Sequence, residues 1–431
     1  MSIEKIKSEL AATAGYKRLE ALFDEGSFSP IAPFAASVDG PAEASAGFGE
    51  IGGCEVYAFA QNSDVCGGAM SKAQAAKIEK VYELALKTGT PVIGIYDSVG
   101  ARVSQGVDML QSYGKLLNLS GKLAGVVPQI SVVLGPCEGT AALLASEADF
   151  VIQSEQGKFT VKTNGDGGSA DDNMKHGVIA VKSPDESSAL QTAKELVSML
   201  PRNNLSDAFE IDIPAPVPSG DLISEFADGG SFIELYEGSS QNIKTGFVRI
   251  DGRTVGVVST SGEIDRRCAE KAAKMVRFCD AFSIPVVTLA DSTGFRCIKS
   301  AAKLTAAYAE ATTAKITVVT GQAYGAFYMA AAGTGASTDV TFALENACVS
   351  PVNPEAGMII LAPEKLKTDK AGREKALEEF KKEQCSALKA AQQGFIDSVL
   401  TKDELRSALV GALTMLSGKR EATLPKKHST L

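Results

Sequence analysis

Two turns built from small residues have the composition of sites that stabilise a developing negative charge. In the first, the apolar residues 130–134 lead into GPCEGT (135–140) and an alanine-rich stretch, and in the second, residues 316–320 lead into GQAYGA (321–326). Small residues allow a sharp turn that brings peptide N–H groups close to a ligand at the start of a helix, where the helix dipole favours negative charge. We interpret each turn as a candidate oxyanion hole, whose N–H donors lower the energy of an enolate oxygen.

A packing role is the alternative for the glycines of these turns. Gly139 and Gly325 could serve only to let a strand and a helix approach each other closely. Two such turns at equivalent places favour the oxyanion interpretation, because a reaction with two carbonyl substrates, each passing through an enolate-like state, needs two holes.

A second pair of motifs, DSVGAR (97–102) and DSTGFR (291–296), follows two further apolar runs. In α/β proteins the loops after parallel strands are where ligands are contacted. Asp97 and Asp291 could lie in such a loop for a ligand, or they could cap the next helix. Arg102 and Arg296 could bind phosphate groups, or they could form salt bridges.

These paired motifs belong to an internal duplication. DEGSF (24–28) matches DGGSF (228–232), GFGEIGG (47–53) matches GFVRIDG (246–252), and QISVVLGPCEG (129–139) matches KITVVTGQAYG (315–325). Asp97, Gly100 and Arg102 each meet their counterpart 194 positions later, whereas the last pair of blocks is 186 positions apart. The second copy is therefore eight residues shorter between these blocks.

Each copy alternates short β-rich runs (92–96, 130–134, 286–290 and 316–320) with longer helix-like stretches (71–87, 266–282 and 301–314). This order predicts βαβ crossovers, and hence an α/β fold with mainly parallel sheets covered by helices. The proline-rich segment 207–221 is the expected linker. We therefore predict two domains, residues 1–215 and 216–431.

The composition excludes several classes of function. The net charge is −9 and the charged residues are well mixed, so no nucleic-acid surface is indicated. No run approaches the roughly 18 apolar residues that span a bilayer. The charged start MSIEKIKSELA lacks the apolar core of a signal peptide, which predicts a cytoplasmic protein.

Few side chains are available for metal binding or proton transfer. The eight cysteines are scattered without a C-x-x-C pair, so neither a metal site nor a disulfide framework is expected. The sequence has two histidines, His176 and His428, and His428 lies in a tail where we expect it to be non-catalytic. The chemistry is therefore expected to rest on backbone donors and bound cofactors.

Over nearly its whole length the chain resembles the carboxyltransferase subunits of propionyl-CoA carboxylase, glutaconyl-CoA decarboxylase and their relatives. The motifs that carry this resemblance are SDVCGGAMS (63–71), DSVGARVSQGVDMLQSYG (97–114), GVVPQISVVLGPCEGTAA (125–142), CDAFSIPVVTLADSTGF (279–295), AAKLTAAYAEATTAKITVVTGQAYGAFY (301–328), GFIDSVL (394–400) and KREATLPKKH (419–428).

The resemblance implies two tandem crotonase-like domains, each a ββα superhelix. It also implies transfer of a carboxyl group between biotin on a separate carrier and the α-carbon of an acyl-CoA. Gly139 and Thr140 would then stabilise the acyl-CoA carbonyl, while the ureido oxygen of carboxybiotin would be held by Gly325, Ala326 and Phe327. Residues of the same motifs are expected to bind substrate or cofactor: Gly67, Gly68, Arg102, Arg296, Tyr324, Tyr328 and Met329.

The expected partners also follow from the resemblance. They are a biotin carrier protein, biotin carboxylase or membrane decarboxylase subunits, and further copies of this chain in a dimer or a trimer of dimers. A separate carrier agrees with the sequence, which contains no Ala-Met-Lys-Met biotinylation motif and no ATP-binding glycine-rich loop.

The chain departs from the family pattern at both turns. Gly139-Thr140 stands where Gly-Gly is typical, the segment 325–329 reads GAFYM in place of GGAYD, and a longer glycine-rich stretch is reduced to RCIKS (296–300). These changes predict narrower pockets and an altered biotin site. Two alternatives therefore remain: a crotonase-like acyl-CoA hydrolase or isomerase that has lost biotin, and a degenerate partner subunit without activity.

Overall fold

The structure is a computed structural model that describes residues 2–37, 40–162, 167–211, 216, 219–333, 335, 338–367 and 369–421. The chain forms two compact units: unit 1 is Met1–Phe209 with Tyr236–Ser239, and unit 2 is Glu210–Leu235 with Ser240–Leu431. The boundary predicted near residue 215 falls at a position outside the described residues, so it stays a prediction. No helix in the described ranges is long and apolar enough to cross a bilayer.

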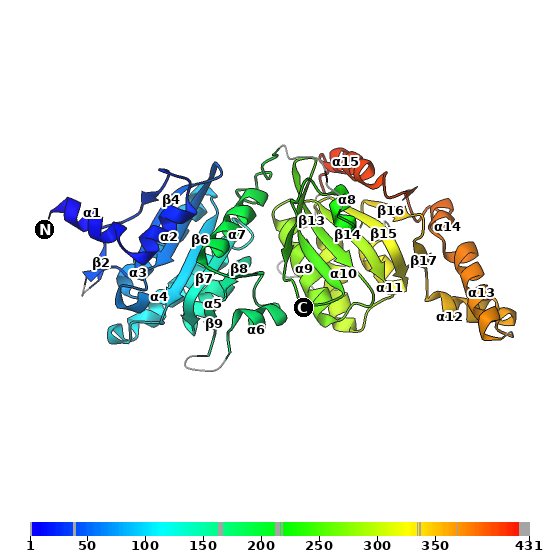
Figure 1. The fold of residues 1–431 in the computed structure, drawn as a ribbon, viewed down its shortest axis with the longest axis horizontal. Helices are drawn as coiled ribbons and strands as arrows, with labels where there is room; N and C mark the ends of the chain where they lie inside the picture. Colours follow the sequence, from blue (N-terminus) through cyan, green and yellow to red (C-terminus); the bar gives the residue numbers. More distant parts are fainter. Residues whose placement is uncertain are drawn as a thin grey trace. The chain divides into compact units, whose positions relative to one another are not determined.

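Unit 1 contains an eight-stranded sheet in the order β1-β4-β5-β6-β7-β8-β10, with β9 beside β7, and a small sheet of β2 and β3 (Figure 1). Its strands are β1 (Ser29–Pro30), β2 (Ala36–Ser37), β3 (Gly40–Pro41), β4 (Ala44–Ile51), β5 (Cys54–Gln61), β6 (Val92–Ser98), β7 (Gln129–Glu138), β8 (Phe150–Ser154), β9 (Lys158–Thr160) and β10 (Val181–Ser183). Its helices are α1 (Ile3–Ala11), α2 (Ala14–Leu22), η1 (Cys66–Gly68), α3 (Lys72–Thr88), η2 (Val103–Gln105), α4 (Asp108–Leu123), α5 (Thr140–Ser146), α6 (Ala170–Lys175) and α7 (Glu186–Met199).

Unit 2 contains a second eight-stranded sheet in the order β11-β12-β13-β14-β15-β16-β18, with β17 beside β15 (Figure 1). Its strands are β11 (Ile233–Leu235), β12 (Ile243–Ile250), β13 (Arg253–Thr260), β14 (Val286–Ser292), β15 (Lys315–Tyr324), β16 (Val340–Leu344), β17 (Cys348–Ser350) and β18 (Ser398–Leu400). Its helices are α8 (Leu222–Phe226), α9 (Arg266–Ala281), α10 (Ile298–Glu310), α11 (Gly325–Ala331), α12 (Pro354–Leu361), η3 (Pro363–Leu366), α13 (Lys370–Phe380), the π-helix η4 (Lys381–Cys385), α14 (Ala387–Gln392) and α15 (Leu405–Leu416).

The two sheets have the same strand order and the same strand directions. In each, an antiparallel pair next to one edge strand (β4–β5, β12–β13) is followed by parallel strands. The match includes an isolated parallel β-bridge in each unit, between Met70 and Ala101 in unit 1 and between Ile264 and Phe295 in unit 2. The predicted α/β fold with mainly parallel sheets, and the duplication behind it, are confirmed.

The strands that lead to the two turns are buried on both faces, as expected of parallel strands covered by helices. The first seven residues of β7 and the first five of β15 are buried, as is every residue of β6 between β5 and β7. Both β7 and β15 run four residues past the predicted strand. In unit 1, side chains of α3, α4 and α5 form one core cluster with alternate residues of the sheet, such as Phe59, Tyr96 and Val133. The central strands are thereby held rigidly, with their carboxyl ends at one edge.

Candidate functional site

The first turn joins β7 to α5. Gly139 has φ 63° and ψ −127°, a conformation that favours glycine. Its N–H group donates to the carbonyl of Thr160 on β9 at 2.9 Å, and its carbonyl accepts from Leu143 at 3.1 Å. Gly139 therefore shapes the turn, while its own N–H group is engaged in the sheet. The N–H groups that lack an intrahelical acceptor are those of the first turn of α5, beginning with Thr140.

The second turn joins β15 to α11. Gly325 has φ 47°, and a Cβ atom at this position would lie 3.0 Å from the carbonyl oxygen of Pro351. Both the backbone conformation and the limited space therefore favour glycine at this position. Here the helix begins at Gly325 itself, so that Ala326 and Phe327 lie in its first turn. Both predicted turns therefore join a strand to a helix through a glycine with a positive φ angle.

A third turn, formed by Cys66, Gly67 and Gly68 after β5, lies against the end of β6. All three residues have left-handed φ angles of 49°, 61° and 67°. Val99 donates to the carbonyl of Gly67 at 3.0 Å, and a Cβ on Gly68 would lie 2.3 Å from the Asp97 carbonyl. Because β5, β6 and β7 are neighbours, the Gly67–Gly68 turn and the Gly139 turn lie at the carboxyl edge of adjacent strands, where α/β proteins bind ligands.

Unit 2 has a shorter connection in place of the Gly67–Gly68 turn, and it keeps one left-handed glycine, Gly262, two residues before its bridging residue. In unit 1, residues 62–69 connect the end of β5 to the bridging residue Met70. In unit 2, only residues 261–263 connect the end of β13 to the bridging residue Ile264. The short connection is closed by a bond from the Gly262 N–H group to the Asp291 carbonyl at 2.9 Å. The two candidate holes are therefore built differently.

A network of buried amide side chains supports the Gly67–Gly68 turn. Gln74 Nε2 donates to the carbonyls of Gly68 (3.1 Å) and Glu43 (2.9 Å), and Gln74 Oε1 accepts from Gln61 Nε2 (3.0 Å). Gln61 Oε1 in turn accepts from the Asp97 N–H group at 3.0 Å. Both glutamines are fully buried, so these bonds fix the turn on the end of β6. Sequence reasoning missed this network, because neither glutamine stands in a recognisable motif.

Asp97 and Asp291 do not cap the helices that follow them, so the capping alternative is wrong. Arg18 Nη1 donates to Asp97 Oδ2 at 2.8 Å, and Asp291 Oδ1 accepts from the N–H group of Gln322 at 2.8 Å. Each carboxylate also lies over a glycine of the next strand, where a Cβ would come within 2.0 Å (Gly135) or 2.4 Å (Gly321) of it. The Asp291 carboxylate thus ties the end of β14 to β15, whereas the Asp97 carboxylate ties the end of β6 to helix α2.

The two predicted phosphate-binding arginines differ in their surroundings. Arg102 Nη1 lies 3.1 Å from Glu43 Oε1 and donates to Ser37 Oγ at 2.6 Å, and its side chain is 12% exposed. Glu43 is fully buried. Lys77 lies near it, and the burial of the Lys77 ammonium group itself lowers the pKa of that group to about 8. Arg296 pairs with Glu263 at the surface, where its side chain is 65% exposed. The salt-bridge alternative thus describes Arg102 well, whereas Arg296 is accessible to a ligand.

The side chains after Gly325 point in different directions. Phe327 is 0% exposed and meets Phe295 edge to face, with the ring centroids 5.9 Å apart, whereas Met329 is 58% exposed. The Tyr328 hydroxyl donates to the Phe395 carbonyl at 2.6 Å, and Tyr324 is buried. At Phe327, the backbone N–H group is therefore what can reach a ligand.

Histidine takes no part in this arrangement as far as the described residues show. His176 is the C-cap of α6, and its Nδ1 atom is 2.7 Å from the carbonyl of Asp172, while His428 lies outside the described residues. Across the described ranges, no group of three histidine, cysteine, aspartate or glutamate side chains could hold a metal ion.

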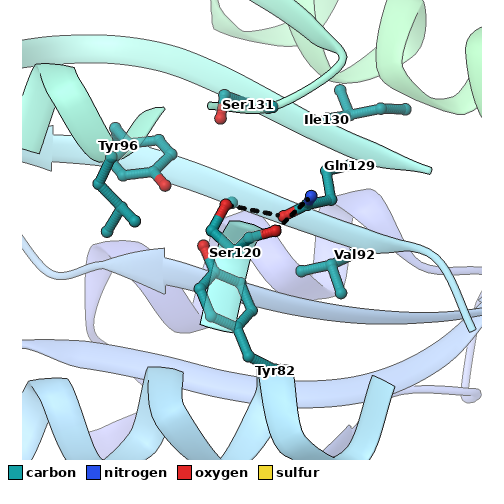
Figure 2. Close-up of a pocket in the computed structure, with 10 residues that line it drawn as sticks. Tyr82, Val92, Tyr96, Ser120, Gln129, Ile130 and Ser131 are labelled. Atoms are coloured by element: carbon teal, nitrogen blue, oxygen red, sulfur yellow. Dashed lines mark hydrogen bonds between the residues drawn. The ribbon is translucent and has the colours of Figure 1, made fainter. Parts of the chain in front are cut away.

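One small cavity lies in the core of unit 1, away from these turns (Figure 2). Its lining includes Tyr82, Tyr96 and Val92, and Ser120 and Gln129 exchange two hydrogen bonds of 3.1 Å beside it. The space open to the centre of a water molecule is about 10 Å³, which suits roughly one water. It lies at the amino ends of β6 and β7, so it is no substrate pocket.

Comparison with known proteins agrees with this geometry. Residues 13–431 match the family described as "Carboxyl transferase domain". The chain is 34% identical to methylmalonyl-CoA decarboxylase subunit alpha of Veillonella parvula, with 100% of this chain and 94% of that protein covered. It is 33% identical to the propionyl-CoA carboxylase beta chain of Saccharopolyspora erythraea, with coverages of 96% and 89%.

A solved structure shares the same fold over the full length. The transcarboxylase 12S hexamer with hydrolysed methylmalonyl-CoA bound superposes with a TM-score of 0.88 and 31% identity, covering 99% of this chain and 94% of that one. The fold agrees with these full-length similarities, because the chain has two matching sheets with a glycine turn at the end of β7 and of β15. The chain belongs to the carboxyl transferase domain family and is a carboxyltransferase subunit of the kind found in acyl-CoA carboxylases and methylmalonyl-CoA decarboxylases.

Proposed function

We propose that this chain moves a carboxyl group between biotin on a separate carrier protein and the α-carbon of an acyl-CoA. The observation that carries the proposal is that the Gly67–Gly68 turn and the Gly139 turn both lie at the carboxyl edge of the unit 1 sheet. In the proposed reaction, the N–H groups in the first turn of α5, beginning with that of Thr140, bind the thioester oxygen as it gains enolate character. Biotin, when bound, supplies the carboxyl group and accepts the α-proton.

Unit 2 is proposed to hold the biotin ring. The ureido oxygen of biotin is a hydrogen-bond acceptor, and the donors that suit it are the N–H groups of Ala326 and Phe327 in the first turn of α11. The left-handed Gly325 places these groups at the end of β15. Arg296, exposed just after β14, is available for the phosphate groups of a ligand.

The substrate and assembly are proposed by extension from relatives. The transcarboxylase 12S structures are hexamers with methylmalonyl-CoA or its hydrolysis product bound, and the Veillonella relative is a methylmalonyl-CoA decarboxylase subunit. By analogy, we propose that this chain acts on a short, branched acyl-CoA and forms a homo-oligomer. A biotin carrier, with biotin carboxylase or membrane decarboxylase subunits, completes the proposed set of partners.

The test is decarboxylation of malonyl-, methylmalonyl- and glutaconyl-CoA by the purified chain, with and without free biotin. The proposal expects release of carbon dioxide from at least one of them that depends on biotin. Equal turnover without biotin would refute it.

A second candidate is an acyl-CoA hydrolase or isomerase that works without biotin. It is favoured by the short connection after β14, since α10 begins at Ile298 and leaves little chain to enclose a ring beside Gly325. Hydrolysis or isomerisation of an acyl-CoA in the absence of biotin would support this candidate. A chain inactive in every assay would point to the third reading, a partner subunit that binds an active carboxyltransferase.

A further inference from the structure

Two amide side chains support the short strand β9, which lies beside the first turn. Gln153, on β8, is fully buried, and Asn173, on α6, is half-buried. Asn173 Nδ2 donates to Gln153 Oε1 at 2.8 Å, so the two side chains form a pair. Both side chains also donate to backbone carbonyls in and around β9.

These bonds hold β9 and the residues on either side of it. Gln153 Nε2 donates to the carbonyls of Gly157 at 2.9 Å and Gly168 at 2.8 Å. Asn173 Nδ2 donates to the carbonyls of Phe159 at 2.9 Å and Gly168 at 3.3 Å. The Phe159 N–H group donates to the same Gly168 carbonyl at 2.8 Å, so three donors converge on it. Residues before, within and after β9 are thereby tied to one amide pair.

Strand β9 in turn holds the first turn. It pairs in parallel with the end of β7, and the Thr160 carbonyl accepts a hydrogen bond from the Gly139 N–H group at 2.9 Å. Thr160 directly follows Phe159, whose carbonyl accepts from Asn173. A displacement of β9 therefore moves Gly139 and, with it, the N–H groups in the first turn of α5.

Unit 2 builds the same strand arrangement without a glutamine at this position. Gln153 is paired with Val133 on β7, and the equivalent residue of unit 2, paired with Val319 on β15, is Ala343. Alanine has no hydrogen-bonding side chain, yet β17 runs parallel to β15 as β9 does to β7. The duplicated fold therefore does not require this glutamine, which points to a role specific to the first turn.

We propose that Gln153 and Asn173 are positioning residues for carboxyl transfer, which act through β9 to aim the N–H groups in the first turn of α5 at the thioester oxygen. Stabilisation of an enolate oxygen depends on donors that are already fixed at the right distance and angle, and such donors need a supporting set of hydrogen bonds. The effect on carboxyl transfer rests on the function proposed above, whereas the coupling of the amide pair to the Gly139 turn does not.

Asn173→Asp tests the effect on the reaction, because aspartate has the shape of asparagine but no N–H group to donate. Asn203→Asp is the matched control, since Asn203 is also half-buried and its Nδ2 atom donates to the carbonyl of the left-handed Gly89, at the end of α3, at 2.8 Å. Asn173→Asp should lower kcat for biotin-dependent decarboxylation by about ten- to a hundredfold with KM nearly unchanged, because misplaced donors weaken transition-state binding more than substrate binding. Asn203→Asp should keep the kcat of the parent. A parent-like kcat in Asn173→Asp, whatever its thermal midpoint, would overturn the positioning role.

Hydrogen exchange tests the coupling without any activity. The Gly139 amide, followed by mass spectrometry of peptides within residues 135–144, should exchange at least about tenfold faster in Asn173→Asp and at the parent's rate in Asn203→Asp. Gln153→Met, which removes the buried partner without adding a charge, should change kcat and exchange in the same way, and it takes the place of an Asn173→Asp chain that does not fold. Parent-like exchange at Gly139 in either folded variant would overturn the coupling. If exchange responds and the parent chain has no carboxyltransferase activity, the function proposal fails and the coupling stands.

Discussion

Thr140 begins α5, the helix position that tolerates proline, so its N–H group can be removed with little harm to the fold. Thr140→Pro should lower kcat/KM for decarboxylation by about a hundredfold, because the loss of one oxyanion donor in other enzymes costs that much or more. Thr140→Ala keeps the N–H group and is the control, with activity near that of the parent. Matching thermal midpoints would show that the turn is intact, and equal activity of the two variants would exclude Thr140 as the donor.

Arg102 and Arg296 occupy equivalent positions and should respond differently to the same substitution. Arg102→Met leaves the buried Glu43 carboxylate without its guanidinium partner, so the free energy of unfolding should fall by about 3–5 kcal/mol. Arg296→Met removes an exposed ion pair with Glu263, which is worth about 1 kcal/mol or less.

Denaturant unfolding measures both changes, and the KM for the acyl-CoA separates stability from ligand binding. Arg296→Met should raise KM if this guanidinium binds phosphate. A stable Arg102→Met chain with a raised KM would instead make Arg102 the ligand-binding residue.

At the scale of elements, Phe327 anchors α11 to the loop after β14 through its edge-to-face contact with Phe295. Because Phe327 is fully buried, Phe327→Ala should cost about 3–5 kcal/mol of unfolding free energy and leave the preference among acyl-CoA substrates unchanged. Met329 follows two residues later in the same helix but is exposed, so Met329→Ala should change the free energy of unfolding by less than about 0.5 kcal/mol.

Thermal unfolding and the ratio of rates on a short and a longer acyl-CoA test these expectations together. A shifted rate ratio in Phe327→Ala at unchanged stability would return this side chain to the pocket lining. The same shift in Met329→Ala would assign specificity to the exposed side of α11.

The two copies of the fold support their strand ends with different side chains at the same place. Gln61 accepts from the Asp97 N–H group in unit 1, and Thr260 Oγ1 accepts from the Asp291 N–H group at 3.0 Å in unit 2. Among the described residues, only unit 1 extends this contact: the Gln61 amide donates to Gln74, and Gln74 donates to the carbonyl of Gly68. Duplication thus preserved the strand end, and each copy acquired its own loop.

At the scale of the whole molecule, unit 1 exposes an apolar segment directly after β6. Val103 is 88% exposed, and Val107 and Leu110 are similarly exposed at the start of α4. Such a cluster indicates a protein interface, in agreement with the proposed homo-oligomer. Val103→Glu together with Leu110→Glu should therefore dissociate the oligomer, because charged groups would be buried in the interface.

Sedimentation at micromolar concentration measures this change. Leu205→Glu, which alters an exposed leucine elsewhere in unit 1, is the matched control and should sediment as the parent does. A monomeric parent chain, or an oligomer unchanged by the double substitution, would contradict the assignment.

The sequence by itself determined the duplication, the order of elements and the position of both glycine turns. These depend on local patterns: apolar runs predict the buried strands β6 and β14, and Gly139 and Gly325 are where the backbone must adopt a left-handed conformation. The bounds of α9, Arg266–Ala281, were close to the predicted 266–282, whereas α10 spans Ile298–Glu310 against a predicted 301–314. Each of these features is set by residues within one turn of helix or one strand.

Only the tertiary structure decided which groups remain available to a ligand. The Gly139 N–H group donates to the Thr160 carbonyl, and the Arg102 guanidinium pairs with the Glu43 carboxylate. None of these partners is near in sequence, and a hydrogen-bonding group gives no sign in its own neighbourhood of which distant segment will satisfy it. Folding brings the distant partner into place because buried polar groups must be paired, and that pairing separates the structural groups from those left for chemistry.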